Sequence, residues 1–228
     1  MYKRQPQEVL DAVLSYAQTH SVPLSSVEGF VRQLIGWREF VRMVYVCDGA
    51  RMRVQNTLHA SRPLPESWWQ GTTGIIPIDH LIATLKEYAY THHIPRLMVA
   101  GNLMTLLGIN PHACYRWFME WYIDAYDWVM VPNVYGMGLY ADGGTMTTKP
   151  YVSSSRYLRT MSDYPSGPWH EWWDALYWVF VDTHREVFSA NHRASFAVSM
   201  FDRFTDEKKR QYHETVAKVY ALHWPSKT

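Results

Sequence analysis

Two adjacent histidines, His92 and His93, open the stretch HHIPRLMVAGN and precede an apolar run. Imidazole titrates near neutral pH, so either side chain could serve as a general acid. Adjacent helical positions point about 100° apart, which prevents the pair from binding one metal ion together. Neither an HExxH motif nor a cysteine at ligand spacing accompanies them. The residues leave two interpretations: a general acid, or a polar side chain that satisfies a loop carbonyl where a helix begins.

Three tryptophans form a second candidate group. Trp117, Trp121 and Trp128 have the spacing of one face of a helix. Such a stripe is typical of a hydrophobic core. It is also typical of an electron path, because indoles oxidise readily and stacked rings shorten each hop.

Two aspartates lie among these rings. Asp124 and Asp127 are three residues apart in an apolar segment, where carboxylates need partners. Arg96, one helix earlier, is the expected partner in a buried ion pair. A pair of this kind is either structural or borders a polar cofactor.

Helical periodicity must position these groups, because strand-like alternation is nearly absent. The pattern predicts an all-α fold, with residues 1–228 in one compact domain. Ser25 to Glu28 read as a helix cap, Gly108 as a helix end, and Asn110 with Pro111 as a helix start. The predicted helices cover residues 5–20, 25–46, about 81–89, 96–108, 110–130, 169–188 and 205–222. Residues 131–152 are predicted to form a glycine-rich loop, either a ligand-contacting segment or a plain connector.

Composition narrows the class of protein. The chain has 228 residues, 47% of them hydrophobic, and a net charge of +1 that indicates no overall nucleic-acid or membrane partner. Its two cysteines, Cys47 and Cys114, argue against a disulfide scaffold or a zinc site. Without a signal segment or membrane span, a cytoplasmic protein is expected. The 11 Trp, 16 Tyr and 8 Phe suit either a large aromatic core or a protein that handles a planar cofactor or electrons.

Six segments, taken in order, resemble the flavin-binding helical domain of the photolyase/cryptochrome superfamily, and within it the bacterial (6-4) photolyases that carry an iron–sulfur cluster. The resemblance runs from about residue 6 to about residue 220. The matching segments are 27–42, 91–102, 121–137, 141–144, 149–151 and 176–178.

The resemblance implies FAD in a bowl of helices. Arg96 and Asp124 would lie beside the flavin ring, and Lys149 is a candidate phosphate ligand. His93 would protonate the DNA lesion, with His92 as its support. Trp117 and Trp69 would relay an electron to the excited flavin, although Phe118 replaces a tyrosine of that relay. The implied cofactor-binding residues are Gln33, Trp37, Arg38, Glu39, Arg96, Asp124, Asp127, Asn133, Gly136 and Lys149.

The chain departs from this branch in three ways. Pro77, Pro165, Pro168 and Glu171 stand where cluster cysteines are expected, so no iron–sulfur centre is predicted, and the prolines with the WHEWW aromatics should fill that space. The N-terminal α/β antenna domain has no counterpart, so no antenna chromophore is expected. The segment that clamps the FAD phosphates in relatives also lies upstream of residue 1, which makes weak flavin binding a prediction.

The resulting hypothesis is a short photolyase. It would repair UV pyrimidine dimers in DNA, single strands included, by electron transfer from reduced FAD under light, with (6-4) products favoured. Alternatives are a cryptochrome-like photosensor that keeps FAD without repair, and a flavin-free DNA-binding protein. The expected phosphate contacts are Arg32, Arg42, Arg156 and Arg159, whose other interpretation is an ordinary solvated surface.

Overall fold

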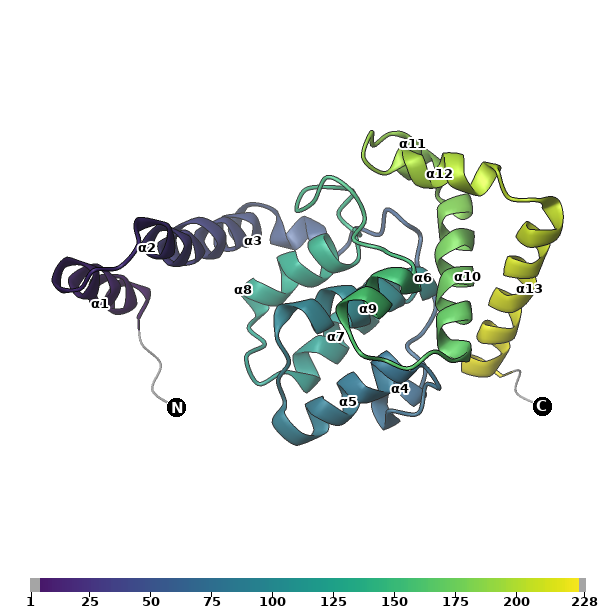
Figure 1. Ribbon diagram of the computed structural model, residues 1–228, viewed down its shortest axis with the longest axis horizontal. Helices are drawn as coiled ribbons and strands as arrows, with labels where there is room; N and C mark the ends of the chain where they lie inside the picture. The colour runs from purple at the N-terminus through teal and green to yellow at the C-terminus, as the bar shows by residue number, and fades with distance from the viewer. Residues whose placement is uncertain (1–4, 226–228) are drawn as a thin grey trace.

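The computed structural model describes residues 5–225, and helices make up nearly all of its regular structure (Figure 1). Within this range the only β pairing is an isolated bridge between Arg62 and Ile109. The all-α prediction is therefore confirmed. The elements are α1 (Pro6–Thr19), α2 (Leu24–Val31), η1 (Arg32–Trp37), α3 (Arg38–Met52), α4 (Ser67–Gln70), α5 (Ile76–Tyr88), η2 (Pro95–Gly101), α6 (Asn102–Leu107), α7 (Pro111–Trp121), α8 (Asp127–Met130), η3 (Val131–Gly138), α9 (Ser155–Met161), α10 (Pro168–Thr183), α11 (Arg185–Ser189), α12 (Ser195–Asp202) and α13 (Asp206–His223).

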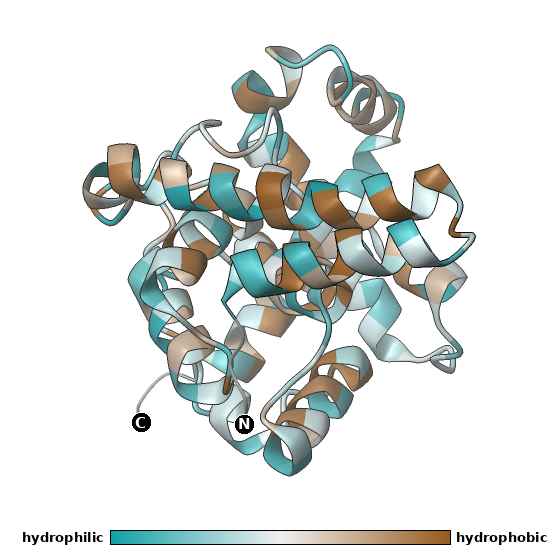
Figure 2. Ribbon diagram, turned by 90° about the vertical axis from the view of Figure 1, so that its left-hand side faces the viewer, coloured by the Kyte–Doolittle hydropathy of each residue, from teal (hydrophilic) through white to brown (hydrophobic). Residues whose placement is uncertain are grey.

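The helices fall into three groups along the long axis of the molecule (Figure 1). Helices α1 and α2 form an arm that leads through α3 into a central body built from α4 to α9. Helix α10 packs along α13 at the far end. The arm has no buried residue, and Figure 2, viewed from its side, shows apolar and polar residues interspersed along the exposed helices. The central body therefore carries the core.

The predicted helix 25–46 is longer than expected and begins differently. It starts at Leu24, where Pro23 is the cap residue and accepts the amide of Ser26 through its carbonyl (2.9 Å). Proline fixes its own φ, so it replaces the serine cap predicted from the sequence. The helix passes through the π-helical segment η1 and continues as α3 to Met52.

The predicted helix 110–130 is two helices. Asn110 caps α7 as expected, accepting the amides of His112 (2.9 Å) and Ala113 (3.3 Å). Tyr122 then turns extended, and the amide of Ile123 bonds to the carbonyl of Ala89 (2.9 Å) outside the helix. Helical structure resumes only at α8. The prediction that Trp128 shares a face with Trp117 and Trp121 is therefore wrong, as is the placement of both aspartates on one helix.

The first eight residues of the predicted loop 131–152 are helical. Its first part forms η3, which is largely buried, and the irregular backbone is confined to residues 139–154. Gly101 of η2 lies against Gly138 of η3, since a Cβ at Gly101 would stand 3.6 Å from the Gly138 Cα. Close approach of the two backbones explains why this glycine-rich stretch folds instead of forming a loop.

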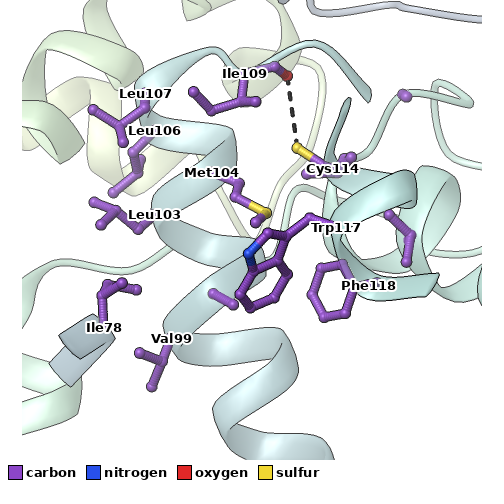
Figure 3. Packing of buried hydrophobic residues seen from close by; sticks show 14 of the residues in the cluster. Ile78, Val99, Leu103, Met104, Leu106, Leu107, Ile109, Cys114, Trp117 and Phe118 are labelled. Atoms are coloured by element: carbon purple, nitrogen blue, oxygen red, sulfur yellow. Dashed lines mark hydrogen bonds between the residues drawn. The ribbon is translucent and has the colours of Figure 1, made fainter. Parts of the chain in front are cut away.

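The core gathers around α6 and α7 (Figure 3). Trp117 is fully buried, and its Nε1 donates to the carbonyl of Trp68 (3.3 Å). The buried Cys114 donates weakly to the carbonyl of Ile109, and burial raises the pKa of its thiol. Figure 3 shows Met104 and Phe118 beside the Trp117 ring. The core thus fixes the indole at the centre of α7 in one position.

Aromatic and proline side chains pack together near the start of α10. Pro77 and Trp169 are buried, and Trp169 Nε1 donates to the carbonyl of Pro165 (2.9 Å). Tyr164 packs on Trp169 and bonds to His80 Nδ1 (2.9 Å). Among residues 5–225, no three His, Cys, Asp or Glu side chains gather so that they could hold a metal ion. No helix in that range is both long and apolar enough to cross a bilayer.

Candidate flavin and lesion cavity

A cavity of about 570 Å³ is lined by residues of the three π-helical segments η1, η2 and η3. Segment η1 contributes Gln33 and Trp37, while η2 and the residues before it contribute the histidines and Arg96. Its volume lies within the usual range of small-molecule sites. The lining residues are Gln33, Trp37, Tyr90, His92, His93, Arg96, Leu97, Gly101, Phe118, Asp124, Val129, Met130, Asn133, Val134, Met137, Gly138 and Leu139.

Arg96 is the most firmly held polar group in the cavity. Its Nε donates to the carbonyl of Thr91 (2.8 Å), and its Nη2 donates to Asp124 Oδ2 (3.0 Å). The guanidinium lies 4.1 Å from the centre of the Tyr122 ring and 5.0 Å from that of Tyr90. The structure therefore forms the predicted Arg96–Asp124 pair and clamps the arginine with two rings.

Asp124 keeps one acceptor free. Its Oδ1 is buried and has no hydrogen-bond partner within the described residues, although Oδ2 binds Arg96. An unpaired buried carboxylate oxygen is costly unless a ligand donor meets it. The same lining contains apolar residues, with Phe118, Met130 and Met137 among them. Arg96 and Asp124 beside these apolar side chains fit a flat heteroaromatic ring with a polar edge.

The two histidines stand exposed at the cavity. Their rings meet edge to face, with centroids 5.9 Å apart. His92 Nδ1 accepts the amide of Ile94 (3.3 Å), which fixes the turn that begins η2. His92 therefore bonds to a backbone amide, the reverse polarity of the predicted bond to a carbonyl. His93 extends into the cavity as the second imidazole.

Five of the residues predicted to bind cofactor lie outside the cavity lining. Arg38 stacks on Trp128 (5.2 Å to the ring centre) and pairs with Glu39. Gly136 faces Met146, whose Cγ would be 2.4 Å from a Cβ at that position. Lys149 is half-buried in the irregular segment 139–154. The fifth is Asp127.

Asp127 belongs to a separate hydrogen-bonded cluster. It accepts from Tyr45 (2.5 Å), Arg53 (2.6 Å) and Tyr115. Burial alone would raise the pKa of Asp127, but these hydrogen bonds outweigh it and hold the pKa below its ordinary value. Both carboxylate oxygens are used, so Asp127 ties α3, α7 and α8 together.

The predicted relay indoles lie behind the Phe118 wall. Trp117 does not reach the cavity, but its ring centre is 5.1 Å from that of Phe118. Trp69 is half-buried and lines a separate surface hollow with Arg116 and Glu120. Trp121 stands between the two indoles, 6.2 Å from Trp117 and 6.3 Å from Trp69 between ring centres.

The four arginines expected to contact DNA divide into two kinds. Arg32 pairs with Glu28, and Arg42 lies 3.5 Å from Glu39, so both are exposed members of helix-surface ion pairs. Arg156 and Arg159 are exposed on α9.

Sequence reasoning missed several cavity residues. Tyr90 and Tyr122 hold Arg96, and Leu97, Met130 and Met137 supply apolar wall. Two tyrosines on either side of an embedded arginine could have indicated the clamp, because guanidinium groups stack on aromatic faces. The apolar residues carry no such signal, since their periodicity matches that of any core.

The chain matches the model of the FAD binding domain of DNA photolyase over residues 30–165, more than half of its length. With the all-helical fold and the cavity inside that range, the chain belongs to this FAD-binding domain family.

Three individual proteins are also similar to this chain in sequence. The chain is 41% identical over 210 residues to the (6-4) photolyase of Agrobacterium fabrum, covering 88% of this chain and 41% of that protein. It therefore spans less than half the length of that relative. It is also 42% identical over 123 residues to an uncharacterized protein of Acanthamoeba polyphaga mimivirus, covering 54% of this chain and 97% of that protein. A second uncharacterized protein of that virus is 37% identical over 84 residues, 36% of this chain and 64% of its own length.

Proposed function

We propose that this chain binds FAD non-covalently and uses it for light-driven repair of UV pyrimidine dimers in DNA. The observation that carries the proposal is the shared cavity. His93, Arg96 and its partner Asp124 all line one cavity in a member of a family described as the FAD binding domain of DNA photolyase.

Different cavity residues would contact the edge and the face of the flavin ring. Asp124 Oδ1 accepts an N–H from the ring edge, and Arg96 places positive charge beside it. Phe118, Met130 and Met137 cover the ring face and exclude water from it. Reduced FAD, when bound and excited, supplies the electron that splits the lesion.

The cavity lining is suited to two adjacent bases extruded from one strand. Trp37 and Tyr90 are exposed aromatic rings that line the same cavity, and bases stack on such rings. His93 lies beside them and would hold the proton given to the lesion. The A. fabrum relative carries the name (6-4) photolyase, which favours (6-4) products as the substrate.

Phosphate contacts would come from the exposed arginines. Arg156 and Arg159 project from α9, whereas Arg32 and Arg42 would have to exchange a carboxylate partner for a phosphate. Binding is expected to weaken steeply with salt, because phosphate neutralisation releases counterions. Damaged or single-stranded DNA should bind best, since extruding an unpaired base costs least.

The test begins with reconstitution. Purified protein incubated with FAD should retain oxidised-flavin absorbance after gel filtration. Irradiated, reduced protein should then restore oligonucleotides that carry a (6-4) product, with oligonucleotides that carry a cyclobutane dimer as the comparison. Flavin retention without repair of either lesion would indicate the photosensor alternative. Failure to retain flavin would overturn the proposal.

His93→Ala should abolish (6-4) repair while FAD retention stays at the parent level, because the side chain acts on the lesion and not on the ring. His20→Ala serves as the control, since His20 is an exposed histidine at the end of α1. Repair by His93→Ala at the parent rate would contradict the assignment of the acid.

A further inference from the structure

The arm made of α1 and α2 has no core of its own. Among residues 6–37, all of which belong to the part of the chain that the structure describes, no side chain is buried. The two helices have 14 and 8 residues, and helices of such lengths are marginal in water unless an apolar face is packed. Figure 1 shows the arm projecting from the central body. A stable arm therefore needs a second surface that covers it.

The apolar side of the arm gathers at a hollow of about 390 Å³ between α1 and α2. The residues that α1 contributes recur every three or four positions, which is the pattern of a helix that buries one face. They are Val9, Ala12, Val13, Tyr16 and Ala17. The face that this pattern predicts to be buried is thus the face that lines the open hollow.

The hollow combines large rings with small side chains. Tyr16 and Phe30 both line it and are 57% and 47% exposed, so they project from the arm. Ala12, Ala17 and Ser26 line the same hollow and leave room beside the rings. Two copies related by a two-fold axis would each place their rings in the room that the other leaves. A patch of this kind is complementary to itself, as an isologous interface requires.

The charges of the arm argue against a nucleic acid or a membrane as its partner. Residues 6–31 contain no lysine or arginine, so the arm offers no cation to DNA phosphates or to anionic lipids. Glu8, Asp11 and Glu28 each have a partner within four positions along the chain. No residue that lines the hollow is charged. The complementary surface is therefore apolar and uncharged, and the arm of a second copy has this composition.

We propose that a second copy of this chain covers the arm, and that the two arms pair about a two-fold axis as a four-helix bundle. Helices joined by short connections pack as antiparallel neighbours in such bundles. The 14 and 8 residues of α1 and α2 together fall within the roughly 20–30 residues that each side of a specific interface contributes.

Pairing of the arms also supports one wall of the cavity. Gln33 and Trp37 of η1 line the cavity, yet both are exposed. The backbone stays helical from α2 into η1, where the Arg32 amide bonds to the carbonyl of Glu28. Holding α2 in a dimer therefore holds Gln33 and Trp37 in place as well. This coupling is independent of which ligand the cavity binds, and so of the proposed function.

Sedimentation equilibrium of the full chain tests the pairing. The parent should move with concentration from 26.8 kDa to twice that mass. Ala12→Glu puts a charge into the hollow while keeping a good helix former in α1. It should raise the dissociation constant of the dimer about a hundredfold or more, because two like charges then meet across the axis.

Gln18→Glu is the matched control. Gln18 is exposed on the same helix, lies outside the lining of the hollow and gains the same charge. It should dimerise as the parent does. Circular dichroism of both variants checks that the helices are kept.

Hydrogen exchange measured by mass spectrometry locates the interface without any substitution. Between dilute and concentrated parent, amide exchange in residues 6–37 should slow about tenfold or more. Helix α13, which already buries Val216 and Val219, is the internal reference and should not change. In Ala12→Glu the exchange in residues 6–37 should stay fast at both concentrations.

A parent that remains at 26.8 kDa at every concentration would overturn the proposal. Dimerisation of Ala12→Glu with the dissociation constant of the parent would do the same. So would a dimer whose slowed amides lie outside residues 6–37. Because none of these measurements uses flavin, loss of FAD binding would count against the proposed function alone.

Discussion

Asp124 and Asp127 lie three residues apart in the segment DAYD, and each pairs with an arginine from a distant part of the chain. The two carboxylates differ in how many of their oxygens have a hydrogen-bond partner. Asp127 receives three side chains and has both oxygens occupied, whereas Asp124 receives Arg96 on one oxygen and leaves the other buried and unpaired. A carboxylate with both oxygens hydrogen-bonded stabilises the fold. A carboxylate that lines a cavity and keeps one oxygen unpaired indicates a place for a ligand.

The largest effect that separates the two should be on flavin affinity. Asp124→Asn removes the charge that would accept a ring N–H, and a hydrogen bond to a charged group contributes about 1.5–3 kcal/mol. The dissociation constant of FAD should rise about tenfold or more, as measured by fluorescence titration. Asp127→Asn should leave it near the parent value. Equal losses of affinity in both variants would contradict the distinction.

The next effect is on the free energy of unfolding. Here the larger change is expected at Asp127 and the smaller one at Asp124. Asp127→Asn places an amide donor against hydroxyl and guanidinium donors. Because the Asp127 side chain is 40% exposed, a loss of only about 1–2 kcal/mol in the free energy of unfolding is expected. Asp124→Asn should change it by about 0.5 kcal/mol or less. Urea unfolding of the two variants beside the parent measures both, and a larger loss in Asp124→Asn would refute the assignment.

The smallest effect is on acid sensitivity. The pKa of Asp127 is lower in the folded chain than in the unfolded chain. Its stabilisation is therefore complete above the unfolded-state value of about 4 and is lost as pH falls through the folded-state value. Parent and Asp127→Asn stabilities should differ at about pH 6 and converge in stronger acid. A difference that persists unchanged in acid would show that charge on Asp127 is not its source.

The sequence predicted the elements whose ends depend on local chemistry. Asn110 and Pro111 define the start of α7, and Gly108 ends α6 in the left-handed region at φ 66°. The break at Tyr122 could not be predicted in this way. Its ring packs against Arg96, and the next amide bonds to Ala89, two long-range contacts that override helix propensity.

The candidate site could likewise be predicted only in part, because some of its residues are placed by long-range contacts. Arg96 with Asp124 followed from the rule that charges embedded in apolar sequence need partners. The place of Asp127 depends on which helix face the chain presents after the break at Tyr122, and spacing along one continuous helix gives the wrong answer there. The contact between Trp121 and Trp69 joins two distant helices, so it is found only from the distance between their rings.

All three π-helical segments recorded in residues 5–225, η1, η2 and η3, line the one cavity. A π segment holds an extra residue within one turn, and removing one residue returns that turn to α geometry while the helix on either side keeps its phase. Deletion within residues 32–37 would thus remove the bulge that places Gln33 and Trp37 in the cavity lining. Chain length within these turns is accordingly a determinant of site chemistry in its own right, and two homologues with the same cavity residues can differ in ligand through a single gap.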